Sequence, residues 1–291
     1  MKWLQHDTTT RSSITGVVAS LENDYLAVTR DGSLVAGQWG GSGRVLARAS
    51  QPLLGIAYAP ENRSICAVGM EGTVLSGREG TIREEQLKSR LRLVGVCSSS
   101  SGEWILAGQF DARSGCLFQG APGAWHEVPF ARHPTGLECI VQYASDKYLV
   151  AGGRGYVGLW SGGAITTIPS GTDHPLRAAS IVSNGIFLVG GGGWAANMPI
   201  LLQGDKRGLV PIESASGNRV IVGIARTEDQ FWICENRSDG ESWRGIVSSL
   251  TNDRTDIAHE FPRLRLNGIA AHRKTLVVWG EDGFLASSQS I

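Results

Sequence analysis

The amino-acid sequence predicts an all-β protein, a seven-bladed β-propeller whose blades are four-stranded antiparallel sheets. The first observation behind this prediction is an apolar segment with a small central residue that recurs every 39 to 45 residues. The second is that only strand patterns and glycine-bearing turns lie between these segments. A period of this length is typical of propellers. The small central residues are Gly16, Gly55, Gly95, Cys139, Ser180, Gly223 and Gly268.

Each repeat supplies its strands in a fixed order. The segment with the small residue is expected to lie innermost, because the inner strands converge on the axis and leave little room for side chains. A second apolar strand follows, from "YLAVTR" in the first repeat to "TLVVWG" in the last. A glycine-bearing turn and a third strand come next, and repeats one to six add a fourth, as in "AWHEVPF". We expect one domain, 1–291, with blades at about 14–50, 53–87, 92–130, 135–170, 176–214, 218–261 and 265–288.

The seventh repeat has no fourth strand after "FLASSQ". The segment Met1–Asp7 precedes the first inner strand and resembles "AWHEVPF" in placing Trp before an alternating stretch. We therefore expect Met1–Asp7 to form the outer strand of the last blade, which would close the ring and cover an open strand edge. The alternative is a disordered N-terminal tail.

The charge balance argues against two broad classes of partner. Lys plus Arg and Asp plus Glu both number 27, so the formal net charge is zero. A chain without a global positive field is not expected to hold nucleic acid or an anionic membrane surface. No run approaches the roughly 18 apolar residues of a membrane span.

The cysteines indicate the redox compartment. The five are scattered, odd in number and without CxxC spacing, and the N-terminus carries no apolar signal region. They are expected to be reduced core residues of a cytoplasmic protein rather than a disulfide framework or a zinc site. We expect no metal and no cofactor.

Basic residues precede most of the inner strands. Because strand direction alternates within a blade, the loop entering the first strand and the turn between strands two and three lie on one face, around the mouth of the axial channel. Arginine forks suit carboxylates and phosphates, so this face is predicted to bind an acidic partner. The alternative is that each arginine pairs with an acid of a neighbouring loop. The candidate binding residues are Arg11, Arg92, Arg132, His133, Arg154, His174, Arg177, Trp194, Arg219 and Arg265.

The sector formed by blades three to five is the least neutralised part of this face. Arg154 lies in the acid-free turn "GGRGY", and Trp194 lies in the long uncharged turn "GGGGWAANMP". A Trp beside several arginines has the composition of a binding hot spot. The alternative for Trp194 is packing against its own blade.

Signatures of catalysis are weak. His133 and His174 precede prolines at equivalent places in successive blades, but equivalent positions of adjacent blades are usually too far apart to share a metal ion. A Cys139–His133 nucleophile pair is conceivable, yet Cys139 fills a place that glycine takes in other blades. No P-loop, GxSxG or HExxH motif is present, so we assign no catalytic residue.

The turn and third strand in "VGMEGTVLSGREGTI", "GGRGYVGLWSGGAI" and "WGEDGFLASSQ" resemble the repeat unit of the seven-bladed photosystem II assembly and stability factors and of the BNR/Asp-box proteins around sialidases. Only "SDGESW" approaches a true Asp-box, and it precedes the third strand. The resemblance implies a propeller fold, and the arginine patch of the assembly factors implies a protein partner.

The sequence therefore predicts a non-catalytic binding propeller, either an assembly factor, an inhibitor or a toxin-immunity protein. Its fold would be monomeric, and it would form a heterodimer with its acidic partner. Two alternatives stay open. One is a hydrolase or lyase acting on an anionic sugar or metabolite at the channel mouth. The other is a lectin, which would favour an aromatic site repeated in each blade.

Overall fold

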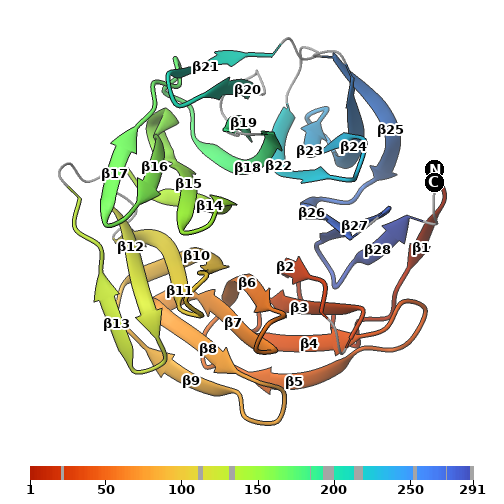
Figure 1. The fold of residues 1–291 in the computed structure, drawn as a ribbon. Helices are drawn as coiled ribbons and strands as arrows, with labels where there is room; N and C mark the ends of the chain where they lie inside the picture. Colours follow the sequence, from red (N-terminus) through yellow and green to blue (C-terminus); the bar gives the residue numbers. More distant parts are fainter. Residues whose placement is uncertain are drawn as a thin grey trace.

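The computed structural model describes residues 1–20, 23–110, 114–130, 135–183, 185–192, 200–212, 219–251, 254–272 and 274–288. Within these ranges 28 strands form seven four-stranded antiparallel sheets arranged in a ring (Figure 1). The predicted seven-bladed propeller is confirmed. No helix in the described part of the chain is long and apolar enough to cross a membrane.

The first four blades follow one another along the chain. They are β2 (Ile14–Val18), β3 (Tyr25–Thr29), β4 (Ser33–Gly37) and β5 (Arg44–Arg48); β6 (Leu53–Ala59), β7 (Ser64–Gly69), β8 (Thr73–Gly77) and β9 (Arg83–Gln86); β10 (Leu91–Ser98), β11 (Trp104–Phe110), β12 (Ser114–Ala121) and β13 (Ala124–Glu127); β14 (Leu137–Ala144), β15 (Lys147–Gly152), β16 (Val157–Ser161) and β17 (Ala164–Thr167). Two single-turn 3₁₀ segments, η1 (Met70–Gly72) and η2 (Gly153–Gly155), form the turns between the second and third strands of blades two and four.

The last three blades complete the ring. They are β18 (Leu176–Ser183), β19 (Ile186–Gly191), β20 (Ile200–Asp205) and β21 (Gly208–Pro211); β22 (Arg219–Arg226), β23 (Phe231–Ser238), β24 (Trp243–Thr251) and β25 (Arg254–Pro262); β26 (Leu266–His272), β27 (Thr275–Gly280), β28 (Leu285–Ser288) and β1 (Trp3–Gln5).

The N-terminal strand closes the ring as predicted. β1 pairs antiparallel with β28, placing Trp3 opposite Ser288 and Gln5 opposite Ala286. The next residue, His6, is buried and hydrogen-bonds through Nε2 to Ser287 Oγ at 2.8 Å, while its Nδ1 accepts the Gly40 N–H of blade one at 3.1 Å. Ring closure therefore combines a strand ladder within blade seven with a side-chain bridge, through His6, from blade seven to blade one.

The apolar core consists of seven clusters, each shared by two adjacent blades. One cluster joins Val68 of blade two to Leu106 of blade three, and another joins Tyr25 of blade one to Val277 of blade seven. The remaining clusters lie between the other neighbouring blades in turn. Burial is thus achieved by stacking sheets side by side, which leaves the centre of the ring as a channel.

The inner strands confirm why small residues recur. A Cβ on Gly55 would lie 2.5 Å from the carbonyl oxygen of Val94 on the next inner strand, and one on Gly95 would lie 2.8 Å from Ile140. The prediction for blade five is wrong by two residues. Ala178, not Ser180, pairs with the second strand in the register that Gly95 and Cys139 occupy in blades three and four.

Candidate functional site

A cavity of about 680 Å³ opens on the propeller axis and is lined by residues from the inner strands of all seven blades. Every inner strand has a β-bulge near its start, at the residue that precedes the small position. A bulged residue is left out of the ladder, so its side chain is free to face the axis. The seven bulged residues, all of which line the cavity, are Thr15, Leu54, Val94, Glu138, Arg177, Val222 and Asn267.

The cavity lies at the end of the channel where the blades turn from their second to their third strands. In blade two the Met70 N–H bonds to the Pro52 carbonyl, and in blade seven the Glu281 N–H bonds to the Arg265 carbonyl. Each bond ties the turn to the residue that enters the inner strand. These loops therefore share one face, as the alternation of strand direction requires. We call this end of the channel the mouth.

Cationic side chains outnumber anionic ones among the residues that line the mouth. The cationic side chains belong to Arg30, Arg92, Arg177 and Arg265, and the anionic ones belong to Glu138 and Glu281. Both glutamates are paired. Arg92 lies 3.2 Å from Glu138 of the next blade, and Arg265 lies 3.4 Å from Glu281. Arg265 also stacks on Trp243, with 5.0 Å from its guanidinium carbon to the ring centre.

The other two arginines of the mouth are Arg30 and Arg177. Neither has an acidic partner among the described residues. Arg30 is exposed and follows β3, whereas Arg177 is the bulged residue of β18. The Nε of Arg177 is buried and has no hydrogen-bond acceptor in the described part of the chain. A buried donor without a partner is costly, so Arg177 is the group at the mouth best placed to gain from an added anion.

The uncharged polar groups of the mouth are committed to neighbouring blades. Thr15 donates to the Leu53 carbonyl at 2.7 Å, and Asn267 donates to the Ile14 carbonyl at 2.8 Å. Asn236 donates to the Leu266 carbonyl and accepts its N–H. These bonds fix the relative positions of strands in adjacent blades, which makes the surroundings of the arginines rigid.

The predicted binding residues divide among different sites. Arg92, Arg177 and Arg265 come together at the mouth. Arg11 is exposed and lies outside that cavity. Arg154 and His174 line a separate cavity at blade four, between its η2 turn and the connection that leads to blade five. The remaining three, Arg132, His133 and Trp194, lie outside the described residues.

Arg219 is placed differently from the other predicted residues. It is 3% exposed and forms an ion pair with Glu235, which is fully buried; the Arg219 Nε donates to Glu235 Oε2 at 2.6 Å. Burial raises the pKa of Glu235, and the charge of Arg219 acts in the opposite direction. Since the guanidinium is enclosed within blade six, we leave Arg219 out of the candidate surface.

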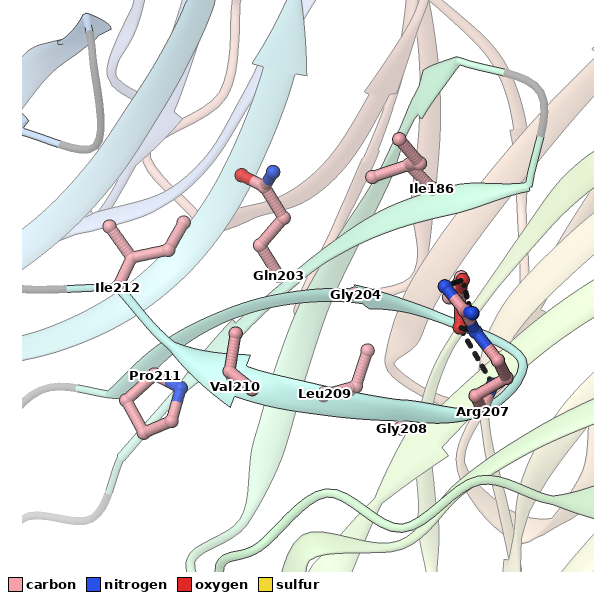
Figure 2. A pocket seen from close by; sticks show the side chains of 10 residues that line it. Ile186, Gln203, Gly204, Arg207, Gly208, Leu209, Val210, Pro211 and Ile212 are labelled. Carbon is pink, nitrogen blue, oxygen red and sulfur yellow. Dashed lines mark hydrogen bonds and ion pairs between the residues drawn. The ribbon is translucent and has the colours of Figure 1, made fainter.

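A further hollow of about 660 Å³ lies along the outer hairpin of blade five, formed by β20 and β21. Figure 2 shows Val210, Pro211 and Ile212 along the hairpin and Arg207 at its end, bonded to the neighbouring carboxylate. That carboxylate is Asp205, whose Oδ2 lies 2.8 Å from Arg207 Nη2. The charged groups of this hollow are thus satisfied by each other.

The cysteines are not arranged for nucleophilic chemistry. All five are free, and burial raises the pKa of each thiol, to about 12 for Cys139. A thiol with such a pKa is almost entirely protonated near neutral pH, and the thiolate is the nucleophile. Among the described residues, no group of three His, Cys, Asp or Glu side chains is placed to hold a metal ion.

Sequence reasoning placed Glu281 on the same face as the binding arginines but missed Arg30 and Glu138 as their neighbours. The signal that could have found Glu138 is its place directly before the small residue of an inner strand, which is the bulged position. Arg30 follows the second strand of blade one as Glu281 follows that of blade seven, so an alignment of the repeats at that point would have placed Arg30 at the same mouth.

No protein-family model and no curated protein matches the sequence. Solved structures share the fold over almost the whole chain. Virginiamycin B lyase from Staphylococcus aureus superposes with a TM-score of 0.79 at 11% identity, covering 98% of each chain. The WD40 β-propeller domain of Doa1 gives 0.76 at 14% identity, covering 99% of this chain and 96% of that one. YCF48 from Cyanidioschyzon merolae gives 0.73 at 14% identity, covering 99% and 98%.

Identities this low show the fold alone. The chain is a seven-bladed β-propeller in the architectural sense, and propellers with this arrangement include both a lyase and WD40 domains. Because one fold hosts unrelated functions, the function must be argued from the site.

Proposed function

We propose that the protein is a non-catalytic binding propeller that recognises an acidic group of a protein partner at the channel mouth. The observation that carries this proposal is Arg177, whose buried Nε lacks an acceptor among the described residues and which lines the mouth together with three further arginines. Two of those three already hold glutamates, so an acidic group of a partner would pair with Arg177 or with Arg30 without breaking an existing pair.

The rigidity of the mouth supports recognition rather than an adaptable surface. Adjacent blades are tied to one another at the mouth by Asn236, Asn267 and Thr15. A preorganised site loses less conformational entropy on binding than a flexible one. A cytoplasmic location and a heterodimer with the partner are further parts of the proposal.

The test starts by identifying the partner through capture on the immobilised protein, followed by an affinity measurement on the purified pair. Reversing the charge at Arg177 (Arg177→Glu) should weaken binding at least tenfold, because a desolvated charge contact contributes about 2–5 kcal/mol to a complex. Arg207→Glu is the matched control, since Arg207 lies on the outer hairpin of blade five. Equal affinities of the wild type and Arg177→Glu at low salt would contradict the proposal.

A further inference from the structure

The turn between the second and third strands has the same left-handed backbone in three blades. Its central residue has φ of 52° at Glu71, 50° at Arg154 and 54° at Asp282, and a glycine with positive φ follows each of them. In blades two and seven the position therefore holds an acid, and in blade four it holds a base. The same backbone carries an acid in two blades and a base in the third. This difference indicates that the Arg154 side chain meets other surroundings than those of Glu71 and Asp282.

In blade two the acid joins the turn to the connection that leads to the next blade. Glu71 Oε2 accepts the Arg90 N–H at 2.8 Å. In blade four the backbone alone makes this link, because the Gly155 N–H donates to the His174 carbonyl at 2.8 Å. A Cβ on Gly155 would lie 1.9 Å from the Thr172 carbonyl oxygen, so the turn and the connection are in close contact. The Arg154 side chain is not needed for that link.

Arg154 lines a cavity of about 940 Å³ between the turn and the connection. No acidic side chain of the described residues pairs with it. The nearby Asp173 carboxylate is 94% exposed and lies 3.9 Å from His174 Nε2. The His174 side chain is 40% exposed and lines the same cavity. A guanidinium and an imidazole thus border a hollow whose lining contains one largely solvated carboxylate.

Hydroxyl groups complete the lining. The Thr172 Oγ1 accepts the His174 N–H at 3.2 Å, which leaves its own proton available to a ligand. Ser170 and Thr135 line the cavity as well, but their hydroxyl groups donate to the Thr172 carbonyl and to the Gly153 carbonyl. The donors that can face a ligand therefore stand on the turn, as Arg154, and on the connection, as Thr172 and His174. A planar carboxylate can be satisfied by one arginine fork, whereas donors in several directions suit a tetrahedral oxyanion.

We propose that this cavity binds a phosphate group, with Arg154 as the principal cation and His174 and Thr172 as further donors. The site is separate from the mouth, because the two cavities share no lining residue. The inference therefore does not depend on the function proposed for the mouth, and each can fail without the other.

The test is a titration of the whole protein with inorganic phosphate, followed by NMR of the histidine rings. The chain has six histidines, and the His174 signal is assigned by its absence in His174→Gln. We expect a saturable shift of that signal with an affinity in the millimolar range, and a similar shift with O-phosphoserine if the phosphate is presented by a protein. Sodium acetate at equal ionic strength should produce a much weaker effect.

Arg154→Glu is the decisive variant, because Glu71 already adopts the same backbone at the equivalent turn and the fold should persist. The saturable shift should disappear in Arg154→Glu and remain in Arg177→Glu. A shift that persists in Arg154→Glu, or no saturable shift in the wild type, would overturn the proposal. An equally strong response to acetate would overturn the assignment to phosphate.

Discussion

Glu235 occupies a position that is glycine in five of the seven blades. The residue that pairs with the inner strand directly before its bulge is Gly69, Gly108, Gly152, Gly191 or Gly280 in those blades. At four of them an added Cβ would come within about 2.2 Å of a carbonyl oxygen. In blade six, β22 and β23 instead stay paired through Arg219 and Arg237. Blade six therefore accommodates a charged pair where five other blades have glycine.

Removing one partner of this pair should be costly. Arg219→Met leaves the Glu235 carboxylate buried without its ion-pair partner, and breaking a buried pair in this way costs about 3–5 kcal/mol. The double variant Arg219→Met/Glu235→Gln should recover most of the loss because no uncompensated charge remains. Urea unfolding of the three proteins measures both differences. A loss below about 1 kcal/mol in the single variant would show that the pair is not important for stability.

His6 links the stability of the closed ring to pH. Burial lowers its pKa from the ordinary 6.5, and Asp24 acts in the opposite direction. Since the folded pKa lies below the unfolded one, the unfolded chain binds the proton more readily. The contribution of His6 to the free energy of unfolding is fully present above pH 6.5 and is lost as pH falls through the folded pKa.

Melting temperatures measured from pH 7.5 to pH 5 should therefore fall less steeply in His6→Gln than in the wild type. The pKa of His259 is also lowered, chiefly by burial, so part of the dependence should remain in the variant. Identical slopes for the two proteins would exclude His6 as a contributor.

At the scale of elements, β1 contacts more of the ring than its three residues indicate. It pairs with β28 of blade seven, and Trp3 packs edge-on against Phe261 of blade six with 5.4 Å between ring centres. His6 stacks on Trp39 of blade one at 5.0 Å. The N-terminal segment thus holds together three successive blades.

Deleting residues 1–7 should lower the melting temperature by about 6–20 °C. Losing one large buried aromatic side chain costs roughly 3–5 kcal/mol of unfolding free energy. In domains of about 150–250 residues, each kcal/mol lowers the melting temperature by about 2–4 °C. Differential scanning calorimetry of the truncated and full chains measures the change. A shift of only a degree or two would mean that the pairing of β1 adds little to stability.

At the scale of the whole molecule, much of the architecture followed from the sequence. Each inner strand needs a small residue where it approaches the next inner strand, as at Gly55 and Gly95. The regular recurrence of that small residue along the sequence predicted seven blades. The closing strand followed from the missing outer strand of the last repeat. Blade five was misaligned because the small residues Ala178, Ala179 and Ser180 stand side by side in "LRAASIV".

The candidate site was harder to predict than the fold. Burial and pairing depend on which side chains the fold brings together, so sequence could not separate Arg219, which is enclosed with Glu235, from Arg177, whose Nε has no acceptor among the described residues. Nor could it show that Arg154 and Arg177 border different cavities. These distinctions arise from the bulges and from the packing of one blade on the next.

The pairing of β1 with β28 also orders events in time. His6 and Ser287 are 281 positions apart, so β1 is synthesised before all the other strands and its partner after them. Blades one to six can stack as they emerge, because each of their strands pairs with neighbours close in the chain. β1 must wait with its edge unpaired until blade seven exists, which is when a growing chain is most exposed to wrong partners. Its length of only three residues makes it a poor template for other chains during that wait.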